Sequence, residues 1–148
     1  MTGATEQSVI ESVPKQLLIG GEWRDASGGG SFAVDDPSTG ATLCEIADAT
    51  ADDAVAALDA ACAAQEEWAA TPPNTRSDIL QGAFELMGER NDELALLMTL
   101  EMGKSIAESK GEIAYAAEFF RWNAGEALRL TGDFKVGGNG ASRVMVTW

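Results

Sequence analysis

The sequence predicts an α+β chain that is mostly helical and carries a peripheral β-ribbon. Two observations predict this class. Up to residue 47, short apolar runs alternate with glycine and proline, which is typical of hairpins. From residue 50 onward, apolar residues recur every three or four positions, which is typical of helices. We therefore expect three or four helices, with a further β-prone run, "RVMVTW", at residues 143–148.

The composition limits the classes of function. The 148 residues include 10 basic and 24 acidic side chains and no histidine, so the net charge is −14. This balance argues against binding to nucleic acid or to an anionic membrane surface, because both partners require basic patches. Without histidine, the chain can form neither a Ser-His or Cys-His pair nor a zinc site of cysteine and histidine. The acidic excess indicates a solvated surface or, alternatively, adaptation to high salt.

The sequence also bears on location. It contains no run of 18 apolar residues, the length that a transmembrane helix requires. Residues 1–15 are polar and lack the basic start and apolar run of a signal peptide, so we expect a flexible lead-in and a cytoplasmic protein. Two strand-turn-strand segments follow it, each with residues suited to a reversal: 17–23 with Gly20 and Gly21, and 32–47 with Pro37 and Gly40.

Helix signals mark the starts and ends of the helical segments. Capping boxes, in which two side chains three residues apart each bond the other's backbone, predict three starts: Thr50 with Asp53, Thr75 with Asp78, and Ser105 with Glu108. Another helix is expected to begin at Asn91 and to end at Gly103. Gly132 is expected to end the longest helix, whose shared face should hold Ile106, Ile113, Ala117, Phe120, Ala124 and Leu128.

The stretch "TLEMGKSIAESKGE", residues 99–112, has the residue types of a catalytic site, with a lysine among glutamates. Nearby carboxylates keep a lysine charged, whereas a reactive lysine needs a lowered pKa. We therefore interpret the stretch as a helix stop at Gly103, a surface lysine at Lys104 and a helix start at Ser105. The glycine runs at 28–30 and 137–140 lack the spacing of phosphate-binding loops and are interpreted as flexible loops.

The two cysteines and an aromatic cluster are interpreted as packing residues. Cys44 lies in a predicted strand without a basic neighbour, and Cys62 lies on the apolar face of a predicted helix, so neither has the surroundings of a nucleophile. The aromatic cluster spans more than one face of the longest helix and predicts packing against a core or, alternatively, against another subunit: Tyr115, Phe119, Phe120 and Trp122.

Four stretches, taken together in this order and spacing, resemble a known family: "LLIGGEW", "DDPSTGATLCEIADAT", "DDAVAALDAACAAQEEWAATPPNTRSDIL" and "LALLMTLEMGKSIAESKGEIAYAAEFFRWNAGEALRLTGD". The chain looks like the N-terminal part of the NAD(P)-dependent aldehyde dehydrogenase superfamily, and the last stretch is most similar to the succinate-semialdehyde dehydrogenase group. The resemblance runs from about Leu17 to Trp148. It implies an α+β fragment of the α/β aldehyde dehydrogenase fold, with helices covering one side of a dinucleotide-binding sheet.

The resemblance implies an oxidoreductase as the parent protein. In the family, a cysteine attacks the aldehyde, hydride passes to the NAD or NADP cofactor, and a glutamate activates water to release the carboxylate. The residues that do this follow the region matched here. No catalytic and no cofactor-binding residue is therefore assigned, and the 148-residue chain alone is expected to be inactive and to bind no cofactor.

The same resemblance implies an organisation and partners. Residues 1–15 would be the lead-in, 16–135 the helical and ribbon part of the cofactor-binding domain, and 136–148 the start of the oligomerisation element. The partners would be the remainder of the dehydrogenase chain and, in the parent, identical subunits. Because "RVMVTW" is strand-like up to Trp148, we expect a piece of a longer enzyme. The alternative is a free-standing helical interaction module without enzyme activity.

One family site is expected to transfer. Several members hold a structural monovalent cation through main-chain oxygens before an "NPSTG"-like turn and through an acidic residue of an "L-[DE]-x-G-K" segment. The matching residues here are Val34, Asp35 and Glu101. Hard cations take oxygen ligands, which all three can supply. This sequence has Glu101 where Asp is commoner and "DDP" where "NP" is usual, and the alternative is a helix-end carboxylate that binds nothing.

Overall fold

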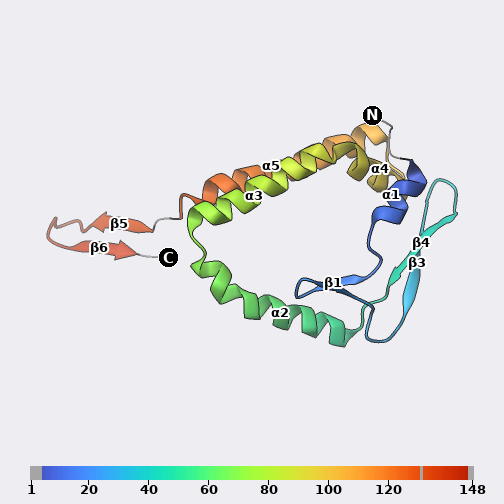
Figure 1. The fold of residues 1–148 in the computed structure, drawn as a ribbon. Helices are drawn as coiled ribbons and strands as arrows, with labels where there is room; N and C mark the ends of the chain where they lie inside the picture. Colours follow the sequence, from blue (N-terminus) through green and yellow to red (C-terminus); the bar gives the residue numbers. More distant parts are fainter. Residues whose placement is uncertain (1–4, 131, 147–148) are drawn as a thin grey trace.

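Helices form most of the chain after residue 50. The structure, a computed structural model, describes residues 5–130 and 132–146 (Figure 1). Its elements in chain order are α1 (Glu6–Ser12), β1 (Leu17–Ile19), β2 (Glu22–Arg24), β3 (Ser31–Asp35), β4 (Thr42–Ala47), α2 (Ala51–Ala70), α3 (Pro73–Glu89), α4 (Asn91–Met102), α5 (Ile106–Ala127), β5 (Asp133–Val136) and β6 (Arg143–Val146). The expected α+β, mostly helical class is confirmed, with α1 added to the four long helices.

The strands of the described residues form three separate antiparallel pairs, β1–β2, β3–β4 and β5–β6. The β1–β2 turn uses Gly20 and Gly21 at φ values of 63° and 84°, a backbone region that glycine enters without strain. The β3–β4 pair has a register irregularity between Val34 and Asp35. Both predicted strand-turn-strand segments are therefore confirmed, and the second carries a local distortion where the cation site was expected.

The core lies between helices. Helix α5 packs along α3 and against α4, and α1 packs on α4 (Figure 1). The buried positions of α5 follow a helical spacing and are mostly small: Ser109, Ile113, Ala117, Ala124 and Ala127. Small side chains let helix axes approach closely, so this interface excludes water with little side-chain volume.

The expected face of α5 is buried at three of its six residues, and Phe120 in its middle is 37% exposed. Ile113, Ala117 and Ala124 are buried, whereas Ile106 and Leu128 are 43% and 48% exposed. Ile106 is the first residue of α5 and Leu128 is its C-cap, so both lie outside its run of buried positions. The helix also stops at Ala127, several residues before the expected terminator Gly132.

The N-terminal lead-in is not unstructured in its described part. Residues Glu6–Ser12 form α1, which begins with a capping box between Thr5 and Ser8. Val9 is only 2% exposed and gives α1 an apolar anchor in the contact with α4. Part of the expected lead-in is therefore helical, and both the capping box and the buried Val9 favour this short helix.

Two of the three predicted capping boxes are confirmed. Thr50 with Asp53 begins α2, and Ser105 with Glu108 begins α5. The box at Thr75 is wrong, because α3 already begins at Pro73, where a proline's fixed φ suits the first helical position. Asn91 is also not the expected cap of α4. Its amide donates to the carbonyl of Lys110 at 3.3 Å, which joins α4 to α5.

Two elements lie apart from the helical core. Helix α2 leads away from α3 and packs mainly on β1, and the β5–β6 hairpin projects as a narrow arm (Figure 1). Because β5 begins at Asp133, the hairpin includes residues before the expected boundary at 136.

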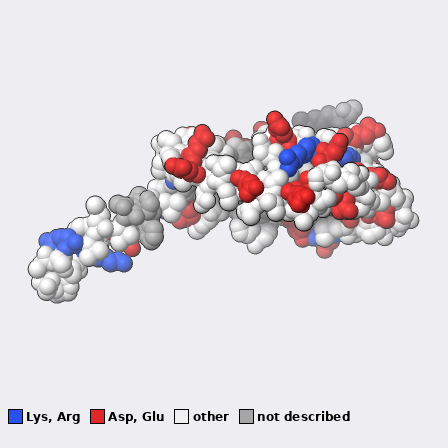
Figure 2. Space-filling model, turned by 90° about the horizontal axis from the view of Figure 1, so that it is seen from below, with Lys and Arg blue, Asp and Glu red and all other residues white. Residues whose placement is uncertain are grey.

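Acidic side chains are spread over the visible face of the body (Figure 2). Among the described residues, no helix is long and apolar enough to cross a membrane.

Candidate functional site

A cavity of about 260 Å³ lies where α1, β1, β3, β4 and α4 meet. Its walls are mainly apolar, with Ile10 from α1 and Leu97 from α4 among the lining residues. Val34 and Glu101, two of the three residues expected to hold a cation, also line it. The fold therefore brings together residues that are 67 positions apart in the sequence (101 − 34).

The turn after β3 positions Val34 beside α4. The carboxylate of Asp36 accepts hydrogen bonds from Ser38 N at 2.8 Å, Ser38 Oγ at 2.6 Å and Thr39 Oγ1 at 2.9 Å. The Ser38 hydroxyl and amide are the main reason why the pKa of Asp36 lies below its ordinary value. Pro37, inside the same turn, lies against Gly103 at the end of α4. This contact fixes the turn on the helix that carries Glu101.

The chemistry of this group fits a hard monovalent cation only in part. Glu101 makes no hydrogen bond or ion pair within the described part of the chain, so its carboxylate is available as a ligand. Asp35 is less favourable, because it does not line the cavity, and its side-chain Oδ1 accepts from Thr42 Oγ1 at 2.8 Å. Main-chain oxygens of Val34 and Asp35 would have to complete the ligand set. No cluster of three acidic, cysteine or histidine ligands occurs in residues 5–130 and 132–146.

The joint between α4 and α5 has the predicted form. Gly103 adopts a left-handed conformation, φ 77° and ψ 8°, and its N–H donates to Thr99 O at 2.9 Å. Lys104 forms an ion pair with Glu112, and its side chain is only 19% exposed, so the expectation of a surface lysine is wrong. Glu108 accepts from the Ser105 hydroxyl at 2.9 Å, which is the largest cause of its lowered pKa. Ser105, Glu108 and Lys104 each have a structural partner, which agrees with the interpretation of the stretch as a helix joint.

Residues 23–147 match the sequence model of the aldehyde dehydrogenase family, which is more than half of the chain. The chain belongs to the aldehyde dehydrogenase family. This confirms the resemblance drawn from the four sequence stretches.

Among similar proteins, succinate-semialdehyde dehydrogenase of Paenarthrobacter nicotinovorans is 51% identical over 104 residues, covering 70% of this chain and 23% of that protein. The NADP(+) succinate-semialdehyde dehydrogenase of Escherichia coli is 45% identical over 132 residues, covering 89% and 27%. A crystal structure of an NADP-dependent enzyme of E. coli superposes with a TM-score of 0.84 at 44% identity, covering 88% and 27%. The chain thus spans about a quarter of the length of these aldehyde dehydrogenases, and the expected fold class, a fragment of their fold, is confirmed.

The two cysteines differ in their burial. Both are free thiols, with Cys44 half-buried in the cavity wall and Cys62 exposed on α2. The expectation that Cys62 packs in a core is wrong, because Val55 and Leu58 on the same face are also 56% and 61% exposed. Helix α2 turns this apolar face to solvent.

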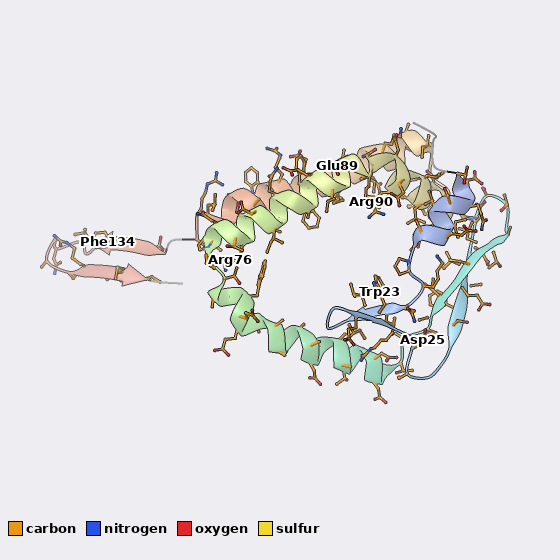
Figure 3. All side chains as sticks on the ribbon, viewed as in Figure 1. Trp23, Asp25, Arg76, Glu89, Arg90 and Phe134 are labelled. Carbon is orange, nitrogen blue, oxygen red and sulfur yellow. The ribbon has the colours of Figure 1, made fainter. Side chains whose placement is uncertain are left out.

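The aromatic cluster of α5 also lies outside the core. Tyr115 and Trp122 are 68% and 67% exposed, and Phe119 is 53% exposed. The rings of Tyr115 and Phe119 meet edge to face with centroids 5.0 Å apart. The core interpretation of these three residues is therefore wrong. Figure 3 likewise shows Phe134 out on the β5–β6 arm, where it is 64% exposed.

Proposed function

We propose that this chain is the N-terminal segment of an NAD(P)-dependent aldehyde dehydrogenase whose whole protein oxidises a semialdehyde to a dicarboxylate. The family match over residues 23–147 carries the proposal. Succinate semialdehyde is the favoured substrate, because two relatives that are 51% and 45% identical are named succinate-semialdehyde dehydrogenases. Glutarate-semialdehyde dehydrogenase of Pseudomonas putida is 42% identical, which supports the same substrate class of aldehydes with a distal carboxylate.

In this proposal, the role of the segment is structural. The cofactor, NAD or NADP, accepts hydride in the whole enzyme, and no residue of this segment touches the reacting atoms. The segment instead supplies a packed core of α3, α4 and α5. Its other elements carry exposed apolar side chains. Trp68 on α2 is 45% exposed, and Phe134 and Met145 on the β5–β6 arm are 64% and 75% exposed. Patches of this kind mark surfaces that bury against another partner. We assign that partner to the remainder of the dehydrogenase chain.

A split-chain experiment tests this role. The segment is co-expressed with the part of the E. coli relative that follows the 132-residue match, and NADP reduction is measured with succinate semialdehyde. We expect the two pieces to co-purify and to oxidise the aldehyde, while each alone is inactive. Co-purification without any oxidation would contradict the proposed parent activity. Failure to associate would instead contradict the docking role.

The cation site is a second, smaller proposal. Its support is that Val34 and Glu101 line one cavity and that Glu101 makes no hydrogen bond or ion pair within the described residues. Potassium or sodium should then stabilise the chain, and Glu101→Gln should abolish that response. Glu22→Gln, an exposed carboxylate on β2, is the matched control and should leave the response intact. If potassium or sodium stabilised the two variants equally, Glu101 would be a helix-end carboxylate that binds no cation.

The alternative function is a free-standing helical interaction module. The exposed stripe of Tyr115, Phe119 and Trp122 on α5 favours it, because such a stripe suits a protein partner. A chain that is monomeric, cooperatively folded and silent to hydrophobic dyes would support it over the docking role. Assembly of the parent into a homo-oligomer through the β5–β6 arm, and a cytoplasmic location, stay predictions that sedimentation and cell fractionation of the parent would test.

A further inference from the structure

Helix α2 has an unusual charge distribution. Its 20 residues contain five acidic side chains and no lysine or arginine: Asp52, Asp53, Asp59, Glu66 and Glu67. Asp52 and Asp53 lie in the first turn, where the positive end of the helix dipole stabilises them. Glu66 and Glu67 lie near the opposite end, where the partial charge is negative. The C-terminal half of α2 is therefore electrostatically unfavourable.

In the segment on its own, without the remainder of the dehydrogenase chain, packing does little to offset this unfavourable charge. Asp53 is the one buried residue of α2, and every residue from 61 to 70 is exposed. The main tertiary contact of the helix is with β1, where Ala60 lies beside Gly20. A helix without tertiary burial depends on its local terms, which here are the high helix propensity of alanine and the charges at its end.

The C-terminal end of α2 is in contact with Thr71 and with one cation, Arg76. Thr71 donates from its hydroxyl to Glu67 O at 2.9 Å and from its backbone N–H to Trp68 O at 3.2 Å. Arg76 on α3 reaches Ala69 O only at 3.5 Å, and Figure 3 shows it at the corner between α2 and α3. Within the described residues, none of the ion pairs includes a carboxylate of α2. Glu66 and Glu67 thus have no ion-pair partner among the described residues.

We propose that the C-terminal half of α2, residues 61–70, is a helix whose stability depends on ionic strength. Salt shortens the range of electrostatic interactions from about 10 Å at 0.1 M to about 3 Å at 1 M. Screening therefore weakens the repulsion between these glutamates and the helix end, while leaving the alanine propensity unchanged. The N-terminal half is held by Asp53, which also accepts from Ser27 N at 3.1 Å, so the response is confined to the far half. Salt would thus control how far α2 extends as a helix.

Amide hydrogen exchange measures this directly. The protection of peptides covering residues 61–70 is compared with that of α5 peptides in 0.02 M and 1 M potassium chloride, and α5 serves as the internal reference. We expect the ratio of α2 to α5 protection to rise with salt. Glu66→Lys should raise the ratio at low salt by roughly two- to five-fold, the effect of one favourable charge at a helix end, and should reduce the salt response.

Asp52→Lys is the matched control, because it changes the net charge by the same amount at the other end of α2. It places a cation at the positive end of the dipole and should lower protection at low salt. Opposite effects of the two variants would support the proposal. Equal effects would show that net charge alone acts, and a ratio of α2 to α5 protection that does not change with salt would overturn the proposal outright.

Discussion

The ring of Pro37 lies against Gly103, so that a Cβ added to Gly103 would come within 2.9 Å of Pro37 Cγ. One residue belongs to the turn after β3 and the other to the joint between α4 and α5. Their contact is what holds Val34 and Glu101 at the same cavity. Position 103 requires glycine for two reasons. Its φ is 77°, and a side chain there would meet the ring of Pro37.

Gly103→Ala should destabilise the chain by about 1–3 kcal/mol, through left-handed backbone strain and displacement of Pro37. Urea unfolding followed by far-UV circular dichroism measures the change. Gly111→Ala, in the interior of α5 with open space around its Cβ position, is the control. It should stabilise by about 0.5–1 kcal/mol, because alanine is the better helix former. A loss of stability at Gly111 equal to that at Gly103 would contradict the assigned contact.

Thr50→Ala should destabilise α2 by about 1 kcal/mol, since it removes the acceptor for Asp53 N and the first half of a capping box. Thr75→Ala is its natural comparison, because Thr75 lies inside α3 and caps nothing. That variant should be neutral or slightly stabilising. Thermal unfolding of the two variants gives the difference in their stability. Equal losses of stability would show that Thr75 caps α3 and that the helix does not begin at Pro73.

Stability should fall as the solution is acidified below about pH 4, close to the unfolded aspartate pKa of about 3.9. The pKa of Asp53 is lowered mainly by the backbone N–H of Thr50, and the pKa of Asp36 mainly by the Ser38 hydroxyl. A carboxyl whose folded pKa is lowered contributes stability above its unfolded pKa and loses it as pH falls through the folded value.

Asp36→Asn and Asp53→Asn should therefore reduce the slope of stability against pH in this acidic range. Urea midpoints measured between pH 2.5 and pH 6 for each variant and the parent chain test this. Asp59→Asn on the exposed face of α2, for which no hydrogen bond is present among the described residues, is the control and should keep the full slope. An unchanged slope in both test variants would contradict the assigned role of these hydrogen bonds.

The helix joint at residues 102–108 could be predicted from the sequence, and α1 could not. Gly103, Ser105 and Glu108 act through bonds to residues at most four positions away, so their pattern is visible locally. Helix α1 depends on the burial of Val9 in its contact with α4, roughly eighty positions later, and its capping box has serine in place of glutamate. The predicted start of α3 at Thr75 was also wrong. The helix begins at Pro73, because the fixed φ of proline suits the first helical position.

The candidate site could be predicted only through the family resemblance. Neither charge nor spacing relates Val34 to Glu101, and their meeting depends on the Pro37–Gly103 contact, a tertiary event. The outward orientation of Tyr115 and Trp122 was missed for a related reason. Helical periodicity shows that apolar residues share a face, but it does not show whether a second element covers that face.

The most direct test of the account is a chimeric enzyme. The segment of the E. coli succinate-semialdehyde dehydrogenase that matches this chain, 132 residues at 45% identity, is replaced by this chain, and NADP reduction with succinate semialdehyde is measured. The account predicts a folded chimera that oxidises the aldehyde. A chimera that folds and binds NADP but shows no oxidation above that of a catalytic-cysteine variant would contradict it.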